Sequence, residues 1–212
     1  YFEKGLQLLE QVQDERGIIS NCSGMMCAYF GLGMYDESLN WGMKGLRLAE
    51  KSKDRRLITQ ALGNIAVSYL ELGYFTDSKR ALDAVRKLGI PKDESNKTAL
   101  DILEARLHLV DCNLEAASKF IEQALENALK IQYRLLICES YRIRGVVNYR
   151  LGAYEQSYQD FGDAIGIAKN SHLLEQLVLT YYECGKVEYE RGHYQLCLLY
   201  TSPSPRDPKT SR

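Results

Sequence analysis

The chain repeats itself with a period of about 40 residues, and this repetition limits its possible folds more than any other feature. A glycine lies two residues before an aromatic residue at four places, and these glycines are Gly33, Gly73, Gly152 and Gly192. Their successive separations are 40, 79 and 40 residues. The double interval holds a degenerate copy in which Cys112 takes the place of the glycine. The chain is therefore expected to be an array of related units.

Each unit has the apolar periodicity of helices. In the second unit apolar residues recur every three to four positions, from Ala61 to Leu70 before the glycine and from Ala81 to Val85 after it. A glycine at the end of the first helix can adopt a left-handed conformation and satisfy the last carbonyl groups. Small residues such as Ala66 and Ser78 mark where the paired helices approach closely. Each unit is thus predicted to be a helix hairpin.

These residues resemble the tetratricopeptide repeat family, which has small residues at its helix contacts and a glycine and an aromatic residue at its turn. The resemblance covers residues 1–196 and implies an all-α fold, an α-solenoid built as a right-handed superhelix of antiparallel helix hairpins. A period of about 40 exceeds the 34 residues usual in the family. It is similar to the extended repeats of MalT-like activators, bacterial signalling proteins and kinesin light chains.

The register divides residues 1–196 into expected units. They are a partial unit at 1–18, full units at about 19–58, 59–97, 98–137 and 138–177, and a truncated unit at 178–196. A single hairpin cannot bury its apolar face alone, so stability is expected to come from stacking of neighbouring units. Neither end of the array carries a polar capping helix, which predicts a fragment of a longer array.

Residues 197–212 form a separate segment that should not be read as part of the fold. Their sequence, CLLYTSPSPRDPKTSR, resembles the conceptual translation of a transposase sequencing adapter. The alternative is a genuine Ser/Pro-rich linker. We treat this segment as non-native, because such scars are excluded before fold reasoning. The remaining 24 basic and 27 acidic residues leave a net charge of −3.

Composition argues against several classes of partner. An acidic balance without a basic tract does not suit nucleic acid, whose phosphates select clustered Lys and Arg. The apolar runs are far shorter than the roughly 20 residues that cross a bilayer. Six cysteines without a CxxC pair are typical of reduced thiols in a cytoplasmic protein. We therefore expect neither nucleic-acid nor membrane binding.

No arrangement of residues predicts catalysis, and we expect neither an enzyme nor a cofactor. Phosphate-binding, hydrolase and metalloprotease motifs are all missing from the sequence. His108 and Cys112 are spaced i, i+4 and could share a metal ion, but zinc sites need three or four ligands. No metal is therefore expected. Charged stretches such as LRLAEKSKDRRL are interpreted as solvated helix faces.

The family resemblance implies a concave groove lined by the first helix of each unit. The register assigns eight candidate peptide-binding residues to it: Gln60, Asn64, Arg106, Arg142, Tyr149, Tyr182, Lys186 and Tyr189. The basic residues among them would suit an acidic peptide through charge-assisted hydrogen bonds, and the tyrosines would supply rigid apolar contact. An equal alternative is that they are surface residues paired with Glu139, Glu183 or Glu190.

The function expected from these features is a protein- or peptide-binding scaffold. It is interpreted as a fragment of the regulatory or sensory region of a larger bacterial signalling or transcription-regulatory protein. Two alternatives remain open. One is the regulatory segment of an enzyme such as a nucleotide cyclase or histidine kinase. The other is a MalT-like small-molecule sensor, which would require a deep apolar cavity with convergent polar groups.

Overall fold

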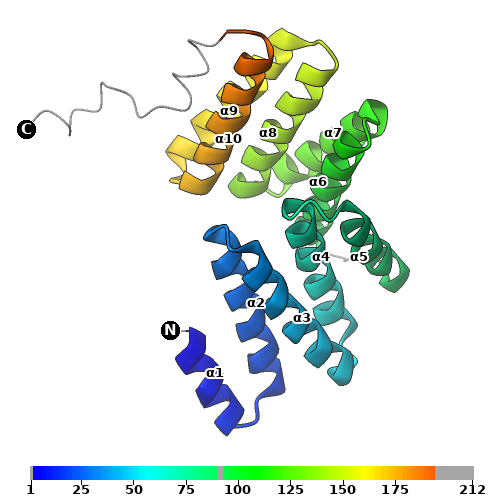
Figure 1. Ribbon diagram of the computed structural model, residues 1–212, viewed down its shortest axis with the longest axis vertical. Coiled ribbons are helices and arrows are strands. Elements are labelled where there is room, and N and C mark those ends of the chain that lie inside the picture. The colour runs from blue at the N-terminus through cyan, green and yellow to red at the C-terminus, as the bar shows by residue number, and fades with distance from the viewer. Residues whose placement is uncertain (1, 90–92, 194–212) are drawn as a thin grey trace, which may run out of the picture. The chain divides into compact units, whose positions relative to one another are not determined.

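A computed structural model describes residues 2–89 and 93–193, and all of their regular elements are α-helices (Figure 1). The all-α fold class predicted from the sequence is confirmed. The helices are α1 (Phe2–Gln11), α2 (Glu15–Gly31), α3 (Tyr35–Ser52), α4 (Arg55–Glu71), α5 (Phe75–Leu88), α6 (Glu94–Val110), α7 (Leu114–Lys130), α8 (Arg134–Arg150), α9 (Tyr154–Asn170) and α10 (Leu174–Glu190). The adapter-like segment 197–212 lies outside the described residues.

The chain divides into two compact units, Tyr1–Leu103 and Glu104–Arg212, and each is described by itself. The first unit contains α1 to α5 and the N-terminal part of α6. The second contains the remainder of α6 and α7 to α10. Within each unit, helices that follow one another in sequence pack together as hairpins, among them α2 with α3, α4 with α5, and α8 with α9.

The corner after the first helix of each hairpin has the same backbone geometry in every copy. The corner residues have positive φ values of 72° at Gly33, 78° at Gly73, 56° at Cys112, 80° at Gly152 and 76° at Gly192. In each copy the next amide closes the helix by donating to the carbonyl five residues before it, at 2.8–2.9 Å. The predicted equivalence of these corners is confirmed, including the degenerate copy at Cys112.

The helices begin earlier than the unit boundaries expected from the sequence. First helices start at Glu15, Arg55, Glu94, Arg134 and Leu174, whereas the approximate unit boundaries expected from the register are at 19, 59, 98, 138 and 178. The physical reason at three of these starts is an aspartate cap, which for α6 is Asp93, whose carboxylate accepts a hydrogen bond from Asn96 N at 3.0 Å. Asp14 accepts a hydrogen bond from Gly17 N at 3.0 Å, and Asp54 accepts from Arg56 N and Leu57 N at 3.0 and 3.2 Å.

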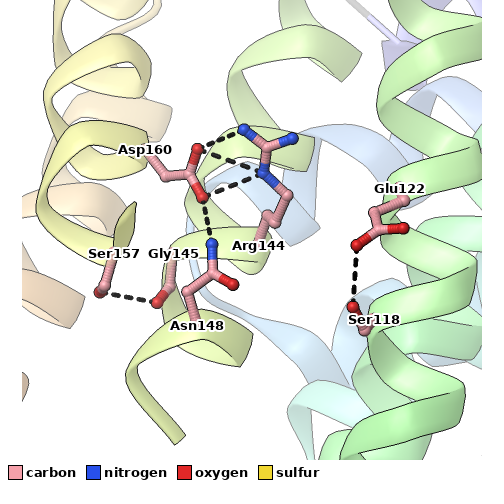
Figure 2. A network of polar contacts seen from close by, with 7 residues as sticks. All are labelled: Ser118, Glu122, Arg144, Gly145, Asn148, Ser157 and Asp160. Atoms are coloured by element: carbon pink, nitrogen blue, oxygen red, sulfur yellow. Dashed lines mark hydrogen bonds and ion pairs between the residues drawn. The ribbon is translucent and has the colours of Figure 1, made fainter. Parts of the chain in front are cut away.

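Small residues let the two helices of a hairpin approach closely, as predicted. A buried serine at the start of the second helix donates to a carbonyl twelve residues earlier in three hairpins: Ser38 to Met26 at 2.9 Å, Ser78 to Ala66 at 2.7 Å and Ser157 to Gly145 at 2.7 Å. Figure 2 shows the last of these bonds. Each bond joins one helix of the pair directly to the backbone of the other.

Apolar clusters fill the space between the helices. In the first unit Met26, Leu46, Ala61 and Ile65 form a cluster on which Trp41 packs. In the second unit one cluster contains Cys138, Ala164 and Ala168, and another contains Phe161, Cys184 and Val187. None of the described helices combines the length and apolar character that a membrane span requires.

Two buried thiols, those of Cys138 and Cys184, are part of these clusters. Cys22, Cys138 and Cys184 are free and buried, whereas Cys27 and Cys112 are exposed. Burial raises the pKa of Cys138 to about 11 and that of Cys184 to about 12. The buried thiols therefore stay protonated at neutral pH and act as small apolar side chains. Cys197 lies outside the described residues.

Candidate functional site

The first unit contains a cavity of about 750 Å³ between α4 and the N-terminal part of α6, with the end of α5 contributing to its wall. Pockets that bind small ligands typically measure about 300–1,000 Å³. Both α4 and α6 are first helices of their hairpins. The cavity therefore lies on the helices to which the sequence assigned the groove.

Helix α4 presents one continuous face to the cavity. Arg56, Gln60, Gly63, Asn64 and Val67 all line it. Their spacing of three to four residues places them on one side of a helix. The Asp54 cap fixes where this helix begins, and it thereby fixes which residues face the cavity.

Helix α6 supplies the opposite wall with Asn96, Ala99, Leu100 and Leu103, again at helical spacing. Asp93 precedes this helix and also lines the cavity. Its carboxylate accepts hydrogen bonds from Ser95 Oγ at 2.6 Å and Asn96 N at 3.0 Å. These bonds lower the pKa of Asp93, and the bond from Ser95 has the largest effect. Asp93 is thus an ionised cap of α6 at neutral pH.

The lining combines an apolar surface with side-chain amides. Val67, Leu88, Leu100 and Leu103 provide apolar contact area, and Leu103 is only 2% exposed. Gln60, Asn64 and Asn96 provide three carboxamides. A carboxamide donates and accepts hydrogen bonds, so it can pair with both the N–H and the C=O of a peptide. The cavity can therefore satisfy an extended backbone while it buries a side chain.

Two arginines lie at the N-terminal end of the α4 face, and they differ in what they contact. Arg55 Nη2 donates a hydrogen bond to the carbonyl of Leu88, the last residue of α5. Arg56 is exposed and forms no ion pair within residues 2–89 and 93–193. Arg55 therefore links α4 to the end of α5, whereas the charged group of Arg56 is exposed.

Two of the eight residues predicted for the groove, Gln60 and Asn64, line this cavity. The sequence analysis missed Arg55, Arg56 and Asn96. It had placed the stretch that includes both arginines on a solvated face. The spacing of Arg56 could have identified it, because Arg56 lies four residues before Gln60, about one helical turn away on the same face of the helix.

Arg142 is the predicted groove residue whose surroundings depart most from the expectation. It is 5% exposed, and its Nη2 lies 3.6 Å from Glu139 Oε1. The contact with Glu139 agrees with the pairing in the alternative interpretation, but the burial of Arg142 does not agree with the surface position which that interpretation assumed. The register could not reveal the burial, because the same position is a glycine in α4 and a tyrosine in α10.

Tyr149 is half-buried in the second unit. Its ring lies 5.6 Å from that of Tyr154 and packs against the cluster of Phe161, Cys184 and Val187. Burial, followed by the nearby Glu190 carboxylate, raises the pKa of Tyr149. Tyr149 is therefore partly a core residue.

The last three predicted residues of the second unit share one face of α10. Tyr182 and Tyr189 are 60% and 63% exposed, and Lys186 is exposed between them. Arg106, on α6, is half-buried. These residues belong to the second unit, whereas Gln60 and Asn64 belong to the first.

A polar network joins α8 to α9 (Figure 2). Asp160 is 2% exposed and accepts hydrogen bonds from Arg144 at 2.5–3.2 Å and from Asn148 Nδ2 at 2.8 Å. The bond to Asp160 is the main cause that raises the pKa of Arg144. All the acceptor oxygens of Asp160 are thus used within the hairpin, and the network is structural in character.

A second buried carboxylate joins α9 to the end of α10. Glu188 is 2% exposed and accepts hydrogen bonds from the Tyr158 hydroxyl and from His193 Nδ1, the latter at 2.9 Å. Arg191 donates to the Tyr158 oxygen at 2.7 Å and lies over the Tyr154 ring at 4.7 Å. These contacts join α9 to the end of α10.

The spacing of His108 and Cys112 does not produce a metal site in the structure. The His108 ring stacks on Phe120 at 5.4 Å, and Cys112 is an exposed corner residue. Among residues 2–89 and 93–193, no three His, Cys, Asp or Glu side chains are grouped to hold a metal ion.

Solved structures share this fold. The chain matches BtubC (BKLC) from P. vanneervenii with a TM-score of 0.64 and 16% identity, over 94% of this chain and 87% of that one. It matches the apo form of RapI with a TM-score of 0.67 and 14% identity, over 94% and 78% of the two chains. A third match is PH0952 from Pyrococcus horikoshii, a signal transduction ATPase with a tetratricopeptide repeat sensor. That TM-score is 0.65 at 19% identity, over 92% of this chain and 30% of that one. No protein-family model and no curated protein sequence matches the chain.

Proposed function

We propose that this chain, whose fold is a tetratricopeptide-like α-solenoid, is a non-catalytic scaffold that binds a peptide segment of a partner protein in the cavity between α4 and α6. The cavity itself carries the proposal, because it joins an apolar wall to three carboxamides on adjacent first helices. This combination suits an extended peptide better than a flat protein surface.

The chemistry of the lining supports a peptide ligand. An extended segment exposes N–H and C=O groups that lose their water on burial, and each lost hydrogen bond is costly unless it is replaced. Gln60, Asn64 and Asn96 can replace these bonds without requiring a particular peptide side chain. Val67, Leu100 and Leu103 supply the apolar area that favours burial.

The wider role that we propose is regulatory. PH0952 combines a tetratricopeptide repeat sensor with a signal transduction ATPase, and the chain spans only 30% of its length. By analogy, we propose that the chain is part of the regulatory or sensory region of a larger bacterial signalling or transcription-regulatory protein in the cytoplasm. The regulatory role rests on similarity of fold, whereas the ligand is inferred from the residues that line the cavity.

A small-molecule sensor is a second candidate function, and one observation favours it. The cavity has the volume and the apolar wall with convergent polar groups that small-ligand pockets have. A small ligand and a peptide would contact the same carboxamides. The two candidate functions are therefore distinguished by testing which class of compound binds.

The proposal is tested by selecting random heptapeptides that bind the immobilised chain. We expect the selected peptides to bind the double variant Gln60→Ala/Asn64→Ala at least about tenfold more weakly, since hydrogen bonds within a buried site contribute about 1 kcal/mol or more each. Gln156→Ala, an exposed amide on α9, is the matched control and should leave binding unchanged.

Two results would count against peptide binding. One is a selection that enriches no peptide above background. The other is equal binding by the double variant and the Gln156→Ala control. A thermal-shift screen of small organic acids follows in either case. A shift that disappears in the double variant would support the small-molecule sensor in place of the peptide scaffold.

A further inference from the structure

Gly63 is an unusual residue for the middle of α4. A glycine inside a helix weakens it relative to alanine, because the unfolded chain loses more conformational freedom. The first helices of the other hairpins have side chains at the corresponding position, ten residues before the corner. Those residues are Ser23, Ile102, Arg142 and Tyr182. Only α4, among these helices, leaves the position empty.

Helix packing does not explain this glycine. A Cβ atom added at Gly63 would lie 3.6 Å from Leu100 Cδ2, which is an ordinary van der Waals distance. By contrast, a Cβ at Gly145 would lie 2.8 Å from the Phe161 ring, and one at Gly42 would lie 2.8 Å from Met26 Sδ. Those two glycines allow close packing within the chain. Gly63 instead leaves room inside the cavity.

The room beside Gly63 is apolar. Val67 lies one turn further along α4, and Leu100 and Leu103 face it from α6. A bulky apolar side chain of a ligand in this space would contact Val67, Leu100 and Leu103. It would also contact the backbone of α4 at Gly63. Any residue larger than glycine at position 63 would occupy part of the same space.

Arg56 lies on the same face of α4, seven residues before Gly63. Seven helical residues correspond to about 10 Å along the axis. An extended peptide covers this distance in about three residues. A ligand that places an apolar side chain beside Gly63 can therefore present a carboxylate to Arg56 about three residues away.

We propose that Gly63 sets the specificity of the cavity, which receives one bulky apolar side chain of an extended peptide while Arg56 pairs with a carboxylate about three residues from it. The inference deepens the proposed function and rests on it. The positive charge at this end of the cavity comes from two arginines. Arg55 donates to the Leu88 carbonyl, whereas Arg56 is exposed without an ion-pair partner among the described residues, which gives the site its preference for an acidic ligand. Asp93, the acidic residue of the lining, is engaged in capping α6.

The test uses a synthetic peptide array in a Gly/Ser host sequence. Each peptide carries one variable apolar residue and one variable charged residue, separated by one to five positions. The full chain is expected to bind peptides with Phe, Leu, Met or Trp at the apolar position and Asp or Glu about three positions away. Replacing the apolar residue by alanine should weaken binding about tenfold or more, as expected for the loss of a buried side chain.

Two variants separate the two parts of the site. Gly63→Leu should abolish the preference for bulky apolar residues while smaller ones still bind, and Gly63→Ala should narrow the preference toward smaller residues. Arg56→Glu should replace the preference for Asp and Glu by one for Lys and Arg, with the apolar preference unchanged. Gly162→Leu, at an exposed glycine of α9 with no atom near its added Cβ, is the matched control and should behave like the original chain.

The two sources of a carboxylate are distinguished by peptides that end three residues after the apolar position, with a free or an amidated C-terminus. Binding that requires the free terminus identifies a main-chain carboxylate, and binding by internal Asp or Glu identifies a side chain. Both results support the pairing with Arg56.

The inference is overturned if Gly63→Leu keeps the preference for bulky residues, although the peptide-binding function would then stand. It is also overturned if Arg56→Glu does not alter the charge preference. Failure of the proposed function looks different, since the original chain would then bind the array no better than Gln60→Ala/Asn64→Ala. Thermal unfolding followed by circular dichroism checks that each variant is folded, and Gly63→Ala introduces no close contact that would prevent folding.

Discussion

At the scale of single residues, two glycines inside the neighbouring helices α8 and α9 have opposite structural roles. Gly145 is buried against Phe161, and Gly162 is exposed with no atom within 4 Å of an added Cβ. The same substitution should therefore have effects of opposite sign at the two positions, although both are inside helices.

We expect Gly162→Ala to raise the free energy of unfolding by about 0.5–1 kcal/mol through helix propensity. Gly145→Ala should lower it by about 1–3 kcal/mol, because its Cβ would lie 2.8 Å from the Phe161 ring. Urea unfolding followed by circular dichroism measures both changes. Stabilisation by Gly145→Ala would show that Phe161 can move aside, contrary to this packing.

Asp101 on α6 gives a pH-dependent prediction. Its Oδ2 is buried without a hydrogen-bond partner, and burial raises the pKa of this carboxyl. A raised folded-state pKa stabilises the protein below the unfolded-state pKa, and this stabilisation is lost as the pH rises through the folded-state value.

Asp101→Asn should therefore stabilise the chain by about 1 kcal/mol at pH 7, where Asp101 is charged in both states. The gain should disappear near pH 3, where the carboxyl is protonated in both states. Urea unfolding at both pH values measures it. Asp163→Asn, at an exposed position of α9, is the control and should show no comparable pH dependence. An equal effect of Asp101→Asn at pH 3 and pH 7 would contradict the role of charge burial.

Two of the cavity residues were predictable from sequence and two important ones were not, for a physical reason. Gln60 and Asn64 were found because the repeat register identifies the inner face of a first helix. Arg56 continues that face, but a charged residue beside other charged residues reads equally well as solvated. Gly63 stands out in the sequence as a glycine inside a helix, but the open space beside it becomes visible only when Leu100 and Leu103 are placed opposite it.

At the scale of helices and hairpins, buried polar contacts as well as apolar area join the two helices in three of the hairpins, α2–α3, α4–α5 and α8–α9. The α8–α9 hairpin also contains the Arg144–Asp160–Asn148 network (Figure 2). The Arg86–Asp83 pair, at 2.7 Å, is also an arginine–aspartate ion pair, but it is exposed to solvent.

We predict that Asp160→Ala lowers the free energy of unfolding by about 2–4 kcal/mol, since it leaves Arg144 and Asn148 without their buried partner. The double variant Arg144→Ala/Asp160→Ala should lose less than the sum of the two single variants. Asp83→Ala is the matched control and should change stability by no more than about 0.5 kcal/mol. Additive effects at Arg144 and Asp160 in urea unfolding would contradict a coupled network.

The sequence predicts that the elements are helices and that they pair as hairpins, but it does not predict the residue at which each helix starts. The corners were found from Gly33, Gly73, Gly152 and the degenerate Cys112, because a left-handed residue is required there. The starts depend on capping chemistry, and Asp14 and Asp54 are caps only in the context of the turn before them. Starts at Arg134 and Leu174 follow Tyr133 and Leu173, which provide no side-chain cap.

At the scale of the whole molecule, packing is local in sequence. Within each of the two units the helices pack mainly on those that adjoin them in the chain. Stability in such an array is approximately a sum of hairpin and nearest-neighbour terms. A defect in one hairpin should therefore remain confined to its neighbours.

Phe161, which is 1% exposed, tests this expectation. Phe161→Ala should cost about 3–5 kcal/mol. Hydrogen–deuterium exchange read by mass spectrometry should accelerate in α8, α9 and α10 and stay unchanged in α2 to α5. Acceleration of equal size in all of these helices would show that the chain unfolds as one cooperative body.

All the described residues that line the cavity fall in one stretch of the chain, from Arg55 to Leu103. Here the walls and the segment that joins them are encoded consecutively. A transplant of the pocket into another helical-repeat protein would therefore move one continuous stretch of chain, together with the rest of α6 and a neighbour for α4 in place of α3.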